Sequence, residues 1–162
     1  LIIAPKHHHS KLANLDISIT VGQSEVHPSQ VLNNLGSVFD TAMTMVPQVS
    51  RTTRSMYMHI RRIGKIRHCL DQSTCQTVTQ ALVISRLDYQ NALLANLPQS
   101  TLEPLKLAQS CDARVVTRSK SCDHVTPLLH NLHWIPVHKQ TKYKVLVLVH
   151  KVLYDHTAPD CL

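Results

Sequence analysis

The sequence predicts a mainly α-helical protein with a small N-terminal β portion. The chain has 162 residues, of which 43% are hydrophobic, but only 4% are aromatic and three are glycine. So few turn-forming residues disfavour a fold of many strands. Apolar and polar residues alternate in the first part of the chain, whereas from position 41 apolar residues recur at spacings of three and four. We therefore predict an incomplete β segment at 1–40 and a helical domain at 41–162.

The N-terminal segment has the period of two that is typical of strands. Within "NLDISITV", Leu15, Ile17, Ile19 and Val21 point one way and the intervening polar residues the other, which predicts a half-buried strand. The stretch "LIIAP" at the start has a similar character. A turn and a second short strand, ending near Asp40, are expected within 27–40.

A basic amphipathic helix is predicted for "SRTTRSMYMHIRRIGKIRHCL", residues 50–70. Its apolar stripe contains Met56, Ile60 and Ile63, and continues to either Ile66 or Arg67. Most of the arginines and lysines lie off this stripe. No acidic residue occurs between Asp40 and Asp71, so the positive charge of this helix is not compensated locally.

The next helix is expected to begin at Asp71, a good N-cap residue, and to end at Pro98. One long core helix is predicted between them, with one buried face formed by four apolar residues: Val78, Leu82, Tyr89 and Leu93.

A third helix has two possible starts. Ser100 with Glu103 forms a capping box, but Pro104 then removes an early hydrogen bond, whereas Thr101 as N-cap leaves Pro104 in the first turn. We favour Thr101. The apolar face contains Leu102, Leu105, Gln109, Ala113 and Val116, and Arg114, Arg118 and Lys120 lie near the C-terminal end, where cations suit the helix dipole.

The stretch "HNLHWIPVHKQTKYK", residues 130–144, is interpreted as a joint between two helices. The first should be capped by Asp123 or Thr126, with Pro127 at its first position. Trp134 is expected to anchor the joint in the core, and Pro136 to end the first helix. The final helix is expected to bury the apolar residues Val145, Leu148, Val149 and Val152.

The charge and the cysteines limit the functional classes. A net charge of +7 favours polyanionic partners, although a basic domain without such a partner has the same composition. No apolar run approaches the roughly 20 residues that cross a bilayer, so no membrane role is expected. Five cysteines without a CxxC pair or a signal peptide indicate a reducing, intracellular location, cytoplasmic or nuclear.

Five blocks along the chain resemble, in order and spacing, reverse transcriptases of LINE-type (non-LTR) retrotransposons. They are "LGSVFD", "SRLDYQNALLANLP", "LKLAQSCDARVVTRS", "DHVTPLLHNLHWIPV" and "YKVLVLVHKVLYDHTAPDCL". The resemblance implies the region from the edge of the polymerase palm through the helical thumb. It further implies that the rest of the palm and the fingers precede Leu1.

The resemblance also implies that this chain does not polymerise nucleic acid by itself. Two-metal nucleotidyl transfer needs clustered carboxylates that hold Mg²⁺, and the family's aspartate pair has no counterpart here, since no two acidic residues are adjacent. We expect no cofactor for this chain, although the intact family enzyme uses Mg²⁺. Asp40 and Asp88 are interpreted as structural residues, in a cap or a local ion pair.

Three positions depart from the family pattern and indicate a truncated or decayed copy. Gln90 replaces a usual cysteine, Pro104 replaces a helix former, and Asp112 interrupts a run of small residues. A carboxylate on a packed helix face costs several kcal/mol if it has no partner. Asp112 is therefore the residue least compatible with the expected packing.

The histidines do not form a recognisable metal motif. His130, His133 and His138, with Cys122 and His124 upstream, lack the paired spacings of zinc sites. We expect His130 and His133 to be a solvated edge and a packing partner of Trp134, and the "HHH" at 7–9 to be exposed.

Two functions from different classes follow. The first is a non-catalytic fragment of an RNA-directed DNA polymerase that contributes thumb structure and weak, sequence-independent contact with an RNA or DNA backbone. The second is a retrotransposon-derived helical module that binds a protein partner. The candidate phosphate-binding residues are Arg51, Arg54, Arg61, Arg62, Lys65, Arg67, Arg114, Arg118, Lys142 and Lys144.

Overall fold

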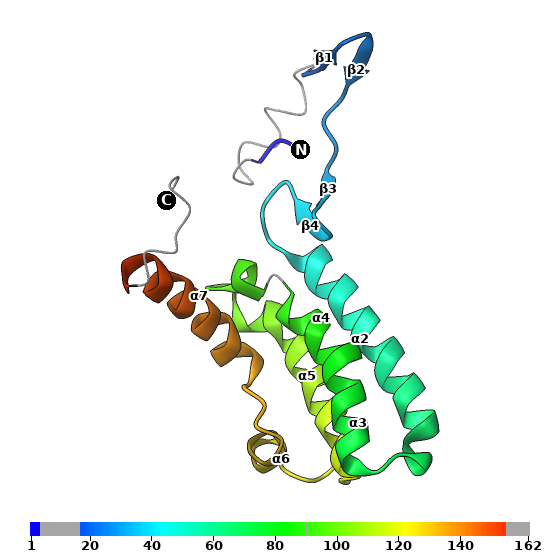
Figure 1. Cartoon of the computed structure of the whole chain (residues 1–162). Coiled ribbons are helices and arrows are strands. Elements are labelled where there is room, and N and C mark those ends of the chain that lie inside the picture. Colours follow the sequence, from blue (N-terminus) through cyan, green and yellow to red (C-terminus); the bar gives the residue numbers. More distant parts are fainter. Residues whose placement is uncertain (4–16, 90, 155–162) are drawn as a thin grey trace. The chain divides into compact units, whose positions relative to one another are not determined.

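The computed structural model describes residues 1–3, 17–89 and 91–154 (Figure 1). The chain divides into two compact units, Leu1–Gln48 and Val49–Leu162. Two small antiparallel sheets occupy the first unit and helices make up the second, which confirms the predicted fold class. The predictions for the "HHH" at 7–9, for Gln90 and for the first half of the N-terminal strand lie outside the described residues.

The N-terminal unit contains two separate hairpins. Strand β1 (Ile19–Val21) pairs with β2 (Ser24–Val26), and β3 (Val31–Asn34) pairs with β4 (Ser37–Asp40). Ile19 and Val21, the two apolar residues of β1, are 65% and 63% exposed, so the predicted half-buried strand is wrong for these residues. A two-stranded ribbon has no buried face unless another layer covers it, and every residue of β1 and β2 is exposed.

Asp40 closes the second hairpin and leads into the first long helix. Its carboxylate accepts hydrogen bonds from the Thr44 backbone N–H (3.0 Å), the Thr44 hydroxyl (3.0 Å) and the Met45 N–H (2.9 Å). Burial raises the pKa of this carboxyl, but the bonds from Thr44 and Met45 outweigh that effect and lower the pKa below its ordinary value. Asp40 therefore has a structural role in the turn before α2 (Val46–Ile66), but it does not cap the helix, because both N–H groups precede Val46.

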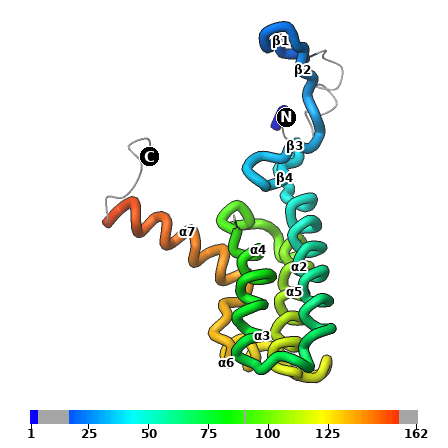
Figure 2. The backbone as a smooth tube through the Cα atoms, turned by 45° about the vertical axis from the view of Figure 1, so that its right-hand side comes forward, coloured from blue at the N-terminus to red at the C-terminus, as the bar shows by residue number. Residues whose placement is uncertain are grey.

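The helical unit is built from a bundle that Figures 1 and 2 show from two sides. Its elements are α2 (Val46–Ile66, which begins in the first unit), α3 (Gln72–Thr79), α4 (Ser85–Asp88), α5 (Gln99–Thr117), α6 (Val125–Asn131) and α7 (Val137–Tyr154). The predicted stripe of α2 is confirmed, because Met56, Ile60 and Ile63 are all buried. Among the described residues, no helix is long and apolar enough to span a membrane.

The sequence predicted one continuous helix for residues 71–97, but the structure divides this segment into several elements. Asp71 does cap α3, accepting a bond from the Thr74 N–H at 3.2 Å. A π-helical turn, Gln80–Ile84, then separates α3 from α4, and a 3-10 turn follows at Asn91–Leu94. The buried face is formed by residues four apart, Cys75, Thr79, Val83, Leu87 and Asn91. The predicted face was wrong, since Leu82, Tyr89 and Leu93 are exposed.

Helix α5 begins earlier than either start considered from the sequence. It runs from Gln99, with Pro98 as a cap that makes no side-chain bond, so Pro104 lies inside the helix. The Ser100 carbonyl then lacks its usual intrahelical donor, but Ser100 is exposed to solvent. The predicted stripe is confirmed, because all five residues, Leu102, Leu105, Gln109, Ala113 and Val116, are buried.

The joint between α6 and α7 agrees with its prediction only in part: Trp134 is buried, but α6 ends at Asn131, before Pro136 is reached, so this proline does not end the first helix. Trp134 is 8% exposed and its backbone N–H donates to the Leu129 carbonyl at 2.8 Å, and α7 begins directly after Pro136. The N-cap of α6 is His124, not Asp123 or Thr126, and Pro127 is its third residue. Val137 and Thr141 are buried, whereas Leu148, Val149 and Val152 are exposed, so the expected core face of α7 was wrong.

Asp112 lies in the interior of the helical unit without a partner. Its side chain is 0% exposed, and neither carboxylate oxygen has a hydrogen bond among the described residues. Burial raises the pKa of this carboxyl to about 8, because the charged form loses its hydration and gains nothing in return. Asp112 is thus a neutral acid at neutral pH, and it weakens the packing of α5.

We predict that the contribution of Asp112 to the stability of the protein falls as pH rises from 5 to 8. The folded state keeps a proton up to a pKa of about 8 that the unfolded chain releases near 3.8, so the contribution of this group is complete below 3.8 and is lost as pH rises towards 8. Asp112→Asn should remove a slope of up to roughly 1.4 kcal/mol per pH unit from the free energy of unfolding.

Urea unfolding of both proteins across this pH range measures the effect. Other titrating groups contribute equally to the two curves, so their difference isolates Asp112. Parallel curves for the parent and Asp112→Asn would contradict the prediction.

Candidate nucleic-acid interface

The exposed face of α2 carries a row of cations, which we call the basic stripe: Arg51, Arg54, Arg61, Arg62 and Lys65. All five are exposed. At 100° per residue, their positions fall within an arc of about 100° on the helix. The buried stripe of Met56, Ile60 and Ile63 occupies the opposite side. The same helix therefore has one side in the core and a strongly positive side in water.

The composition of the segment and its neighbours keep this face positive. No acidic residue stands between Asp40 and Asp71, so no helical neighbour at i+3 or i+4 neutralises the stripe. Arg51 makes a contact of its own within the structure. The other four cations, from Arg54 to Lys65, are the candidates for contact with an anion.

Arg86 of α4 is an exposed cation that was not predicted from the sequence. Burial lowers the pKa of His59 on α2, and the charges of Arg86 and Arg62 lower it further.

Arg67 does not belong to this face, in contrast to the prediction from the sequence. It is 9% exposed, and its guanidinium donates to the carbonyls of Val115 (2.9 Å), Val116 (2.7 Å) and Leu70 (2.6 Å). The first two belong to the last turn of α5, where carbonyls lack intrahelical donors. Arg67 therefore caps a helix and is not available to a phosphate in this structure.

Arg114 and Arg118 also make contacts at the end of α5. Arg118 adopts a left-handed conformation as the C-cap, with a φ of 56°, and donates to the carbonyls of Arg67 (3.0 Å) and Leu70 (3.3 Å). Arg114 donates to the Asp123 carbonyl at 3.2 Å. These cations complement the negative end of the helix dipole, and their partners are backbone carbonyls of this chain.

The two lysines predicted on the last helix lie apart from the basic stripe in sequence and in structure. Lys142 and Lys144 are exposed residues of α7. Lys144 lines a cavity beside Asp88, and burial raises the pKa of Asp88 while the charge of Lys144 opposes the rise. Asp88 accepts a hydrogen bond from the Gln140 side chain. Its role is thus a contact between α4 and α7, not the cap or local ion pair that was expected.

No metal centre is assembled by the part of the chain that the structure describes. Within it, no three side chains of His, Cys, Asp or Glu lie close enough to hold an ion. His130 and His133 are both exposed. His133 has a φ of 56° and lines the same cavity as Trp134. The absence of zinc from the protein stays a prediction.

Comparison with known proteins identifies no relative of this chain. No family model matches it, and neither a curated protein nor a solved structure is significantly similar.

The buried position of Arg67 and the exposed position of Arg61 predict different effects of substitution on the free energy of unfolding. Arg67→Gln removes charge-assisted bonds and leaves buried carbonyls of α5 without donors, so it should lower the free energy of unfolding by roughly 1.5–3 kcal/mol. Arg61→Gln, the matched control on the exposed face, should change it by less than about 0.5 kcal/mol. Urea denaturation followed by circular dichroism measures both. Equal stability of the two variants would show that the contacts of Arg67 do not stabilise the bundle.

Proposed function

We propose that this chain is a non-catalytic fragment of a reverse transcriptase of a non-LTR retrotransposon, and that its helical unit binds the phosphate backbone of a template–primer duplex. The observation that carries the proposal is the basic stripe of α2, which lies opposite a buried apolar stripe and has no acidic residue nearby in sequence. The five sequence blocks that resemble LINE-type enzymes supply the choice of polymerase.

The dimensions of the stripe suit a nucleic-acid backbone. From Arg54 to Lys65 the helix rises about 16 Å, and phosphates of one strand of a duplex follow one another at roughly 3.4 Å along the axis. Four long, flexible cations spread over that length can reach several phosphates at once. Because each contact releases condensed counterions, the binding is electrostatic and depends on salt.

The proposed contact is independent of base sequence. Lysine and arginine side chains that reach phosphates fix the position of a helix on a duplex, but they do not read base edges. A thumb that must slide along its substrate needs this kind of contact.

The two aspartates considered as stand-ins for catalytic residues both have hydrogen-bond partners within the fold. Asp40 already accepts three bonds from Thr44 and Met45, and Asp88 accepts one from Gln140. A metal-dependent polymerase needs carboxylates whose oxygens are free to hold Mg²⁺ against a triphosphate. We therefore assign these two carboxylates to the fold.

A retrotransposon-derived protein-interaction module is the second candidate, and the outer part of α7 favours it. Beyond Thr141 this helix exposes large apolar side chains, including Leu146, Leu148 and Leu153, at 66%, 50% and 62%. An exposed apolar surface of this kind is typical of a binding site for another protein. The two functions use different helices and can be tested separately.

Binding to duplexes tests the first candidate. The parent protein should bind DNA and RNA–DNA hybrid duplexes weakly, with log affinity falling against log salt at a slope of roughly −2 to −4. The triple variant Arg61→Gln, Arg62→Gln and Lys65→Gln keeps helix propensity, so its circular dichroism should be unchanged while affinity and slope both drop. Fluorescence anisotropy at several salt concentrations measures this.

A charge-matched control separates the stripe from net charge. Lys120→Gln, Lys139→Gln and Lys151→Gln remove the same number of exposed cations elsewhere, and this variant should retain most of the parent's affinity. Equal losses in both triple variants would indicate only a diffuse electrostatic attraction. If the stripe variant binds like the parent, or if neither binds at low salt, the interaction module becomes the better proposal.

The purified chain should not extend a primer on an RNA or DNA template with Mg²⁺ or Mn²⁺. The reason is the lack of adjacent carboxylates in the sequence. A primer-extension assay with labelled nucleotides measures incorporation, and an intact reverse transcriptase serves as the positive control. Incorporation above the level of a protein-free blank would contradict the prediction.

A further inference from the structure

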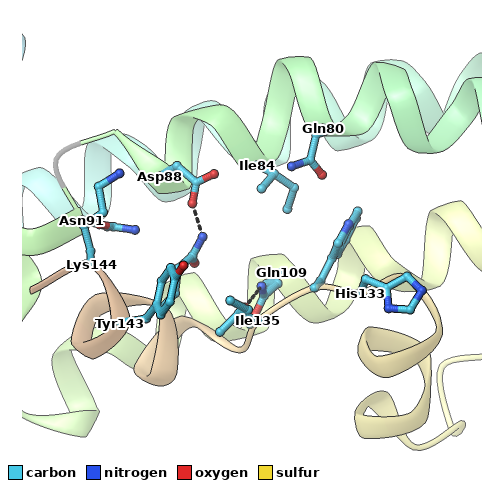
Figure 3. Close-up of a pocket in the computed structure, with 11 residues that line it drawn as sticks. Gln80, Ile84, Asp88, Asn91, Gln109, His133, Ile135, Tyr143 and Lys144 are labelled. Atoms are coloured by element: carbon cyan, nitrogen blue, oxygen red, sulfur yellow. Dashed lines mark hydrogen bonds between the residues drawn. The ribbon is translucent and has the colours of Figure 1, made fainter. Parts of the chain in front are cut away.

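Helix α7 is held by the bundle at its start and is uncovered at its end. Val137 is buried and its N–H donates to the Gln109 side chain of α5 at 3.2 Å. The Gln140 side chain donates a hydrogen bond to Asp88 of α4, as Figure 3 shows. From 148 to 154, by contrast, every residue is exposed. The first turns of α7 therefore belong to the bundle, whereas its last turns have a free surface.

A strip of apolar side chains runs along the side of α7 that is buried at its start. We call it the α7 strip, and it consists of Val145, Leu148, Val149 and Val152. At 100° per residue, these four residues lie within an arc of about 100° on the helix. The same arc contains Thr141, which is buried in the bundle. The α7 strip is therefore the continuation of a packing face.

The α7 strip is uncovered where it leaves the bundle. Leu148, Val149 and Val152 are 50%, 47% and 38% exposed. Apolar residues at positions i, i+3, i+4 and i+7 are those by which a helix docks on an apolar surface. Valine is also a weaker helix former than leucine or alanine, so this end of α7 depends on packing for its stability. The strip thus fits a second apolar surface.

The charges that border the α7 strip are all positive. At 100° per residue, Lys144 and Lys151 follow one edge of the strip and Lys142 lies at the other, and all three are exposed. The sequence contains no acidic residue between Asp123 and Asp155. A partner with lysine or arginine beside its apolar face would be repelled, whereas aspartate or glutamate at those positions would be attracted.

Two other occupants match the surface less well. A second copy of α7 carries the same lysines and no carboxylate, so it offers no opposite charge. An anionic membrane would attract the lysines, but a helix that lies in a bilayer interface has one apolar and one polar face. Leu146 and Leu153, at 66% and 62% exposed, place apolar surface on the other side of α7 as well.

We propose that the α7 strip binds an amphipathic helix of another protein, with apolar residues along one side and aspartate or glutamate next to them. Such a helix extends the packing of the bundle along α7, and its carboxylates lie within reach of Lys142, Lys144 and Lys151. The inference rests on the second of the two proposed functions, that of an interaction module, and adds the chemical class of the partner. It does not depend on the basic stripe.

Synthetic helices serve as probes for this surface. The first peptide has leucine at the seam positions of three heptads and glutamate beside them, which also keeps it from pairing with itself. A second has the same seam with lysine in place of glutamate, and a third has the composition of the first in scrambled order. In fluorescence anisotropy, the parent protein should bind the first peptide saturably, and the other two at least roughly tenfold more weakly.

A matched pair of leucine variants tests the apolar contact. Leu148→Gln changes a residue of the α7 strip that is 50% exposed, and it should weaken binding of the glutamate peptide by about fivefold or more. Leu107→Gln changes a leucine of α5 that is 53% exposed and should leave binding unchanged. Neither side chain is buried, so both variants should keep the circular dichroism of the parent.

A charge reversal tests the role of the lysines. Lys142→Glu combined with Lys151→Glu changes one cation on each edge of the α7 strip, and both residues are exposed. This variant should bind the lysine peptide more tightly than the glutamate peptide, which is the reverse of the parent's preference.

Hydrogen exchange locates the contact on the protein. With the glutamate peptide bound, the backbone amides of α7 beyond Thr141 should exchange more slowly, because covering the helix reduces its local opening. The amides of α2 should keep their rates. Slower exchange in α2 and not in α7 would place the peptide on the basic stripe and contradict the proposal.

Two further titrations separate this inference from the proposed functions. The basic-stripe variant Arg61→Gln, Arg62→Gln and Lys65→Gln should bind the glutamate peptide like the parent, and Leu148→Gln should bind a hybrid duplex like the parent. If the parent binds the lysine peptide as tightly as the glutamate peptide, α7 accepts helices without selecting their charge. The interaction module then stands, and the acidic partner does not.

Three other results would overturn the proposal. If the scrambled peptide binds as well as the ordered one, the attraction is diffuse and the α7 strip has no part in it. If sedimentation shows a dimer that Leu148→Gln abolishes, the strip belongs to a second copy. If the protein binds vesicles of phosphatidylserine and phosphatidylcholine through Leu148 but none of the peptides, the occupant is a lipid surface.

Discussion

The packing of the helical unit depends on one buried guanidinium. Arg67 donates to two carbonyls at the end of α5 and to Leu70 in the turn that leads to α3, so one side chain joins three helices. The guanidinium of Arg118, the C-cap residue of α5, donates a hydrogen bond to the backbone carbonyl of Arg67. Such charge-assisted bonds are stronger than neutral ones. They connect the C-terminal end of α2 to the C-terminal end of α5, while the burial of Met56, Ile60 and Ile63 leaves the basic stripe on the exposed side of α2.

Helix α5 is the element to which the other parts are attached. At one end its carbonyls receive Arg67, and in its middle Gln109 holds the joint that precedes α7. The same helix therefore contacts both the end of α2 and the joint that precedes α7. A change that loosens α5 would affect both sites, whereas changes on the exposed faces of α2 or α7 affect one at a time. This separation makes the two proposed activities experimentally independent.

Several buried polar groups weaken the unit that they occupy. Asp112 makes no side-chain hydrogen bond among the described residues, and Thr79 and Trp134 also have buried polar atoms without partners there. Domains are stable by only about 5–15 kcal/mol, so a few such groups lower the free energy of unfolding by a large fraction of its total. For Asp112 the structure offers no compensating contact.

The sequence by itself determined the features that depend on neighbours along the chain. Helical periodicity predicted the buried faces of α2 and α5, Asp71 predicted the start of α3, and Trp134 with Pro136 predicted the joint, because capping and steric restriction act over a few residues. The basic stripe was visible for the same reason.

Tertiary structure alone decided the rest. The sequence predicted Arg67 as a phosphate ligand, but in the structure it donates to distant carbonyls of α5. The buried face of 71–97 is formed by Cys75, Thr79, Val83 and Leu87 and not by the predicted residues. The cavity combines side chains from segments far apart in sequence, and α7 exposes valines and leucines whose pattern indicated a core helix. In each case the deciding partner lies far away in the chain, and periodicity carries no information about it.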